Sequence, residues 1–355
     1  MSRVGRLLTA LALVLVALPV LTGAGNGNGA DARAEHQRIV DFWTHERVAQ
    51  AVPRDFVLDP GTGRYAPSHH RPGHPGGPGG PGGGDGDTST VVTGDPYNDG
   101  GAVDGTTGKV LFALGSSYYV CSASVIEDPS NNNRSLILTA GHCAYDETNG
   151  GFASNWTFIP DYDAAPAPLS TSSKSYCDDT LYGCWTATAL VVHDGFASAG
   201  GFNDQAVAHD WAFAVVGEGG KEGVGPALVE DVVGSQGYSF DAVALDNSET
   251  GHAFGYPAAQ KYRGNDLIYC SNTIDGDPYN DNDTYRLDQC RMTGGSSGGP
   301  WFSGFENGSG TLISVNSYGY TGVHAMHGPF FNSETAVTYN AALTTDTDTT
   351  VGTAP

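Results

Sequence analysis

The sequence predicts an all-β protein, and two observations lead to that prediction. From Lys109 onward, short runs rich in β-branched and aromatic residues alternate with turn residues. Helical periodicity is nearly absent there until residues 334–343, which predict one short helix near the end of the chain. Many short strands separated by turn residues are typical of a β-sandwich or a β-barrel. We therefore expect one large all-β domain with a late short helix.

The start of the chain predicts a signal peptide over residues 1–34. Arg3 and Arg6 lie at the start of an apolar run over residues 7–21, and an A-x-A pattern follows at residues 32–34. The apolar run is shorter than the stretch of about 20 residues that a membrane span needs. We therefore expect a secreted, extracellular protein that does not associate with a membrane.

Composition divides the rest of the chain into four parts. Residues 35–68 predict a propeptide, with a helix over residues 35–51 where apolar residues recur at helical spacing. Residues 69–95 are rich in Gly and Pro and predict a flexible linker. Residues 96–343 form the predicted folded domain, and residues 344–355 predict a disordered tail. The alternative for the N-terminal part is a permanently attached surface arm.

The charge balance restricts the possible partners. The chain has 16 Lys and Arg against 39 Asp and Glu, which gives a net charge of −23 at pH 7. So acidic a surface argues against nucleic-acid binding and favours a soluble protein whose copies repel one another. We expect a monomer.

Six cysteines fit a secreted protein with disulfide bonds. Six cysteines allow 15 connectivities, so the sequence alone leaves the pairing open. Pairing nearest neighbours in sequence is the simplest hypothesis. It joins Cys121 with Cys143, Cys177 with Cys184, and Cys270 with Cys290.

No metal site is predicted. The chain has no C-x-x-C motif. The hexapeptide GDPYND occurs at residues 94–99 and again at residues 276–281, and the carboxylates of the second copy are a possible calcium site. That loop lacks the ligand spacing of an EF-hand, so we expect an acidic surface loop instead.

The stretch TGGSSGGPW at residues 293–301 carries the strongest chemical signal. A serine hydroxyl is a poor nucleophile that needs a base, an acid that orients the base, and donors for the oxyanion. Glycines beside the serine let backbone N–H groups approach a substrate. The stretch also matches G-x-S-x-G formally, but the αβ alternation of the hydrolases that carry that motif is missing.

A histidine and an aspartate precede the serine, each beside a strand-like run. LTAGHC places His142 at the end of one run, and HDWAFAVV places Asp210 at the start of another. Along the chain, CSASVI, LTAGHC, DWAF, GYP, GGSSGGP and SYG occur in the order found in the chymotrypsin-like serine proteases, and together they resemble that family. They cover residues 109–343, and the details resemble secreted bacterial trypsin-like enzymes and glutamyl endopeptidases. The resemblance implies two packed six-stranded antiparallel β-barrels.

The resemblance also implies a role for each matching residue. His142 would be the general base, Asp210 the acid that orients it, and Ser297 the nucleophile. Gly295 and Ser297 would provide the N–H groups of the oxyanion hole. The segment of Ser317, Tyr318 and Gly319 would pair with the substrate backbone as an added strand. Cys121 and Cys143 would form the disulfide that braces the catalytic histidine.

The sequence departs from the family pattern at three positions. Ser296 stands where the pancreatic enzymes have an aspartate that binds the new N-terminus, so we expect no such insertion here. We expect the N-terminal extension to act as a folding aid or a steric cover instead. Arg291 stands at the pocket-floor position and would favour acidic substrates, or it lies on the surface. Asn316 replaces a histidine of many glutamyl endopeptidases, a role that His324 or His327 would have to take.

The expected function is that of a serine endopeptidase acting on proteins or peptides through an acyl-enzyme. Acyl transfer of this kind needs no metal or organic cofactor. The alternatives are an inactive binding protein on a protease fold and an esterase on the same fold.

Overall fold

The computed structural model describes residues 27–68, 91–130, 132–162, 175–221, 225–246, 248–258, 262–281 and 283–352. Most of the predicted signal peptide and of the predicted linker lies outside these residues. No helix in the described ranges is long and apolar enough to cross a membrane.

The first half of the domain is a closed antiparallel barrel, which confirms the predicted architecture for this half. Its strands pair in the order β6-β5-β8-β9-β10-β7, and β7 pairs back to β6. These strands are β5 (Thr107–Leu114), β6 (Ser117–Ile126), β7 (Ser135–Thr139), β8 (Ser154–Pro160), β9 (Trp185–His193) and β10 (Ala212–Val216). Every residue of β7 and of β10 is buried, which explains why these segments are continuous apolar runs in the sequence.

The second half is built on a sheet in which six strands pair in the order β15-β14-β11-β12-β13-β17. These strands are β11 (Thr250–Gly255), β12 (Ile268–Gly276), β13 (Thr284–Asp288), β14 (Pro300–Glu306), β15 (Ser309–Val315) and β17 (Val323–Pro329). The sheet curls so that its first and last strands meet, where the Ser314 hydroxyl donates to the Pro329 carbonyl at 2.7 Å. Two further strands join this sheet: β4 (Val92–Pro96) pairs with β12, and β16 (Tyr318–Tyr320) pairs with β17.

Helices are few and mostly short. The longest in the domain is the predicted C-terminal helix, α7 (Ser333–Ala342), which Asn332 begins with a capping box. The others connect strands: α3 (Ala102–Thr106), α4 (Asp194–Ala197), α5 (Asp204–Ala208) and α6 (Val229–Val233).

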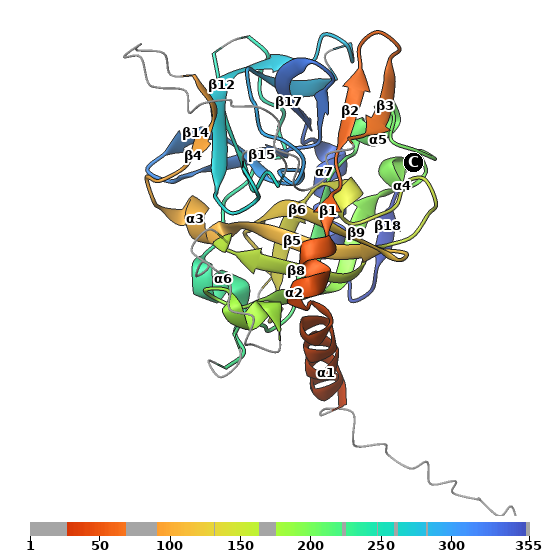
Figure 1. Cartoon of the computed structure of the whole chain (residues 1–355), viewed down its shortest axis with the longest axis vertical. Helices are drawn as coiled ribbons and strands as arrows, with labels where there is room; N and C mark the ends of the chain where they lie inside the picture. Colours follow the sequence, from red (N-terminus) through yellow and green to blue (C-terminus); the bar gives the residue numbers. More distant parts are fainter. Residues whose placement is uncertain are drawn as a thin grey trace, which may run out of the picture.

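The N-terminal arm, residues 27–68, lies against both halves of the domain (Figure 1). It contains α1 (Gly27–Phe42), α2 (His45–Gln50), β1 (Val52–Pro53), β2 (Phe56–Asp59) and β3 (Arg64–Pro67). Strand β1 pairs in parallel with β6 of the first barrel, and β2 pairs in parallel with β16 of the second sheet. The arm therefore bridges the two halves.

Three predicted boundaries are corrected by the structure. The predicted helix over 35–51 is two helices, because Thr44 caps α2 by accepting from the Arg47 N–H. The predicted linker over 69–95 ends earlier, because β4 begins at Val92 and pairs with β12. The predicted disordered tail over 344–355 instead contains β18 (Thr349–Val351), a β-branched stretch that pairs in parallel with β9.

Three disulfides join the cysteines that are nearest neighbours in sequence: Cys121 with Cys143, Cys177 with Cys184, and Cys270 with Cys290. The first lies in the first barrel and the third in the second sheet. Each cross-link closes a short loop of the chain, which lowers the entropy of the unfolded state.

Candidate active site

The histidine and the aspartate that the sequence singles out are in direct contact. His142 lies in a short 3-10 turn (Gly141–Cys143) that follows β7, and Asp210 lies just before β10, which pairs with β7. His142 Nδ1 lies 2.8 Å from Asp210 Oδ2, and the His142 backbone N–H donates to Asp210 Oδ1 at 2.8 Å. Two contacts to one carboxylate hold both the ring and the backbone of the histidine.

The surroundings favour a fixed, water-excluded pair. His142 and Asp210 are both fully buried. The Ser317 hydroxyl donates to Asp210 Oδ2 at 2.5 Å. Sequence reasoning assigns Ser317 only to the binding of substrate, and its hydroxyl contact with Asp210 is a role that the motif alone does not indicate. Asp210 therefore accepts three hydrogen bonds, which satisfy a carboxylate that burial would otherwise penalise.

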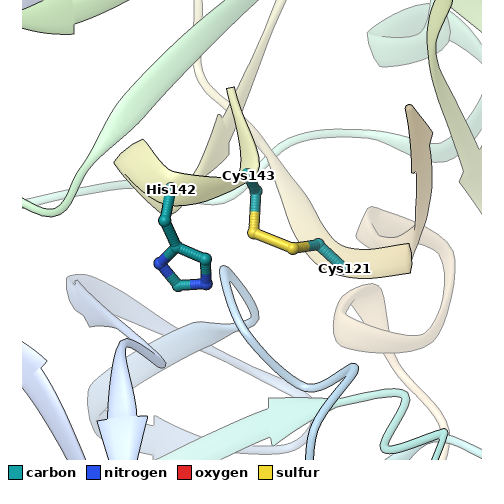
Figure 2. A group of neighbouring side chains, drawn as sticks. All are labelled: Cys121, His142 and Cys143. Atoms are coloured by element: carbon teal, nitrogen blue, oxygen red, sulfur yellow. A yellow bond between two sulfur atoms is a disulfide. The ribbon is translucent and has the colours of Figure 1, made fainter. Parts of the chain in front are cut away.

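The other ring nitrogen of the histidine remains available. Within the described part of the chain, no group hydrogen-bonds to His142 Nε2, although that atom is buried. Figure 2 shows the ring beside the Cys121–Cys143 disulfide, which braces the turn that carries it. The carbonyl oxygen of Ser297 lies 3.7 Å from the Cys143 sulfur, so the predicted serine lies beside the same turn.

The loop that carries Ser297 is held from both halves of the domain. The Ser297 carbonyl accepts from the Ser122 N–H of β6 at 2.7 Å, and the Ser122 hydroxyl donates to the Gly295 carbonyl at 2.8 Å. Asn316 donates to the Ser296 carbonyl at 2.9 Å. These contacts fix the backbone on both sides of Ser297, as a site that positions backbone N–H groups requires.

Two glycines of the motif are required for reasons that the sequence does not reveal. Gly295 has a φ of +99°, and a Cβ there would lie 2.7 Å from the Ala258 nitrogen. Gly298 has a φ of +79°, and a Cβ there would lie 2.1 Å from the Thr139 hydroxyl of β7. Gly298 therefore allows the serine loop to approach the strand that leads to His142.

A pocket of about 910 Å³ opens beside Ser297. The predicted specificity residues Arg291 and His324 line it, as do Ser317, Tyr318 and Gly319. Arg291 and His324 are both exposed. The structure thus brings the predicted substrate-binding segment and Arg291 to one pocket beside the serine.

Asn316, which replaces the family's histidine, and the candidate substitute His327 do not line this pocket. Asn316 is fully buried, and its side chain bonds Ser296, Phe254 and Trp301, so it braces the serine loop. His327 is also fully buried, and burial lowers its pKa to about 4. A neutral buried histidine cannot supply the positive charge that an acidic substrate side chain requires.

The structure corrects the prediction made for the repeated hexapeptide. Asp277 belongs to the second GDPYND copy, for which the sequence predicts an acidic surface loop, but this residue is fully buried. The hydroxyls of Tyr318 and Tyr320 both donate to it. This carboxylate therefore helps to place the tyrosines of β16 beside the pocket.

Among the residues that the structure describes, two groups of side chains have metal-ligand chemistry, and neither has the arrangement of a metal site. Cys121 and Cys143 lie near His142, but their sulfurs form a disulfide and are not thiolates. His193, His209 and Glu334 form the second group. The two histidine rings are stacked with planes 4° apart, so their nitrogen lone pairs lie in separate planes and do not converge.

The N-terminal arm covers the candidate site. The Phe56 ring meets the His142 ring edge-on, with centroids 5.5 Å apart. Arg54 donates to the carbonyl oxygens of His142 and Tyr145 and forms an ion pair with Glu147 at 2.7 Å. Asp55 lies directly against Gly294, where a Cβ would be 2.2 Å from the Asp55 carboxylate.

Comparisons with known proteins place the chain in a family. No family model matches it, and no curated protein matches it by sequence. Among solved structures, it resembles the protease Anisep from Arthrobacter nicotinovorans at 38% identity and a TM-score of 0.55, covering 68% of this chain and 96% of that one.

Two further solved structures are similar. The thermostable serine protease AL20 from an extremophilic microorganism is 35% identical, with a TM-score of 0.55 over 69% of this chain and 100% of the other. A Glu endopeptidase solved with MPD is 17% identical, with a TM-score of 0.51 over 71% of this chain and 97% of the other, and supports the fold alone. The chain thus belongs to the chymotrypsin-like serine proteases and is a serine endopeptidase.

Proposed function

We propose that this endopeptidase cleaves peptide bonds with Ser297, His142 and Asp210 as its catalytic triad. The observation that carries the proposal is the 2.8 Å contact between His142 Nδ1 and Asp210 Oδ2 in a fully buried environment. This contact places the ring proton on Nδ1 and leaves Nε2 as a base. Nε2 has no other partner in the described ranges, and the serine loop lies beside the same turn.

The proposed chemistry is an acyl transfer in two steps. The Ser297 hydroxyl attacks the substrate carbonyl carbon, and its proton passes to His142 Nε2. The C–N bond then breaks, and His142 returns the proton to the leaving amine. Water, deprotonated by the same nitrogen, attacks the acyl carbon. The ester bond to Ser297 Oγ then breaks, His142 returns the proton to that oxygen, and the carboxylic acid product is released. Asp210 stabilises the imidazolium that forms in each step.

The N–H groups of Gly295 and Ser297 are the proposed oxyanion donors. Their backbone is held by the bond from the Ser122 hydroxyl to the Gly295 carbonyl and by the bond from the Ser122 N–H to the Ser297 carbonyl. Donors fixed before the reaction need no rearrangement when negative charge develops on the oxygen, which is why they accelerate it.

Residues 35–68 of the N-terminal arm are the proposed propeptide, and they act as a steric cover. Three contacts support this role: Phe56 on the His142 ring, Arg54 on the His142 carbonyl, and β2 paired with β16. A substrate that pairs with Tyr318–Tyr320 needs the edge that β2 occupies. We infer that the protein is secreted as an inactive precursor, which its signal-like start and three disulfides support.

Covalent labelling tests the triad. A fluorophosphonate probe should react with Ser297 in protein from which the arm has been removed, and Ser297→Ala should abolish the label. Ser296→Ala is the matched control, because Ser296 lies next to the nucleophile and its hydroxyl bonds only the Thr293 carbonyl in the described structure. Peptide hydrolysis should fall by at least about 10³-fold in Ser297→Ala. Labelling that persists in Ser297→Ala would show that another residue is the nucleophile.

A further inference from the structure

A separate hydrophobic cluster forms where the N-terminal arm meets the candidate catalytic histidine. Phe56 of the arm is stacked on Phe202 of the domain, with ring centroids 3.9 Å apart and planes 4° apart. Both rings meet the His142 ring edge-on, at 5.5 Å and 5.6 Å. The buried members of the cluster are Phe56, Leu58, Phe196, Phe202, Ala206, Val207, Tyr318 and Tyr320.

Phe202 has contacts with the arm, through the rings of Phe56 and Tyr65, and separate anchors in its own half of the domain. It precedes Asn203, which caps α5 by accepting from the Ala206 N–H at 3.1 Å. Val207 is the fourth residue of that helix and belongs to the same cluster as Phe202. An apolar residue before the cap and another at the fourth helical position form a hydrophobic staple. These anchors and the edge-on contact of Phe202 with the His142 ring belong to the domain, so they remain when the arm is removed.

The edge of β16 determines which side chain reaches this ring. In the pairing of β2 with β16, Phe56 lies opposite Tyr318. A substrate strand that adds to the same edge has side chains pointing alternately to the two faces of the sheet. One of its side chains therefore points toward Phe202 and His142, in the space that Phe56 fills in the precursor.

We propose that Phe202, together with the His142 ring, forms a substrate subsite that selects aromatic side chains, and that Phe56 occupies it in the precursor. The inference rests on the proposed triad and on removal of the arm, and it names the class of side chain that the same site prefers. An aromatic ring of the substrate can stack on Phe202 in the way that Phe56 does in the precursor. The cluster members that belong to the domain are Phe196, Phe202, Ala206, Val207, Tyr318 and Tyr320. They are aromatic or aliphatic, so an aromatic ring buries apolar surface against them, whereas a charged side chain loses part of its hydration there.

The test uses the full-length chain with a cleavage sequence for an unrelated protease inserted between Ser68 and Val91. The protein is folded, cut and separated from its arm. Its kcat/KM is then measured on peptides that carry Phe, Leu, Ala or Glu at one position at a time on the acyl side of the scissile bond. We expect Phe to exceed Ala by about threefold to tenfold at one position.

Variants at Phe202 identify the residue responsible for the preference. Phe202→Ala should bring the ratio of Phe to Ala peptides close to one, and Phe202→Leu should retain part of it. Phe240→Ala is the matched control, because Phe240 packs on Tyr238 and Tyr339 in another cluster, and it should keep the wild-type ratio. The ratio compares two substrates on one enzyme, so partial misfolding of a variant does not change it.

The outcomes separate this inference from the proposed triad. If the probe labels Ser297 but the ratio is the same in wild type and in both Phe202 variants, the subsite is wrong and the triad stands. If the cut wild-type protein neither cleaves any peptide nor reacts with the probe, the triad is wrong and the subsite fails with it.

Discussion

The two ends of the chain join the domain in similar ways but at different places. Among the described strands, the parallel pairings come from the ends: β1 with β6, β2 with β16, and β18 with β9. The N-terminal arm pairs with both halves of the domain and crosses the candidate site. The C-terminal end, residues 343–352, adds a strand to the first barrel alone (Figure 1).

An arginine anchors each end. Arg54, in the arm, donates to the carbonyls of His142 and Tyr145 and pairs with Glu147, which is buried. Arg134, in the domain, donates to the carbonyls of Leu343 and Thr345 at the C-terminal end. The chemistry is the same, but only Arg54 contacts the turn of the candidate histidine. We infer that detaching the first end changes activity, whereas detaching the second changes stability.

Cutting the chain between Ser68 and Val91 and removing the arm should have the largest effect. The rate at which a fluorophosphonate labels Ser297 should rise by about 100-fold or more, because an opening free energy of only about 2.7 kcal/mol leaves about 1% of the sites open. Deleting residues 349–352 is the matched control and should leave the rate in the uncut chain unchanged. Equal rates before and after removal of the arm would contradict the proposed cover.

Removing the anchoring arginines should have an intermediate effect. In the uncut chain, Arg54→Ala leaves Glu147 buried without its cation in the closed state, which favours opening of the arm. Labelling should become about tenfold faster, which corresponds to about 1.4 kcal/mol. Arg134→Ala should leave labelling unchanged and lower Tm by a few degrees, as measured by calorimetry. Faster labelling in Arg134→Ala would show that both ends control the site.

The smallest effect is expected at Asp348. Its carboxylate accepts from the Leu190 N–H at 2.8 Å, and partial desolvation of the carboxylate raises its pKa although the residue as a whole is exposed. Because the pKa is higher in the folded state than in the unfolded state, Asp348 stabilises the fold below its unfolded value, and this contribution is lost as pH rises through the folded value. Asp348→Asn keeps an acceptor oxygen without the charge, so it should raise Tm slightly at pH 7 but not at pH 3. A lower Tm at pH 7 would contradict this account.

Local sequence features account for much of the candidate site. The order of His142, Asp210 and Ser297 and the glycines around the serine can be identified because each lies in a short motif beside a strand-like run. Other contributions have no local signal. Phe202 follows two glycines in a loop, and its importance comes from the ring of Phe56, which is far away in sequence. Asn316 stands at a specificity position of the family, but its three contacts brace the serine loop.

Predictions for the chain ends succeed less well for a physical reason. Composition indicates whether a segment has enough apolar residues to form a core of its own, and residues 344–355 do not. Composition does not indicate whether a neighbouring strand has free backbone groups. The end of β9, residues 191–193, pairs with Thr349–Val351. The same applies to the arm, where the pairing of β2 depends on an edge that the folded domain provides. The break at Thr44 has a local cause, because its side chain caps α2.

The sequence by itself determined the all-β class, the late helix and the residues of the proposed chemistry, because these depend on side-chain periodicity and on short motifs. Only the tertiary structure decided that the arm crosses the site, that Ser317 bonds Asp210, and that Phe56 stacks on Phe202 beside His142. Such contacts join residues far apart in the chain, and they exist only after both halves have folded and met.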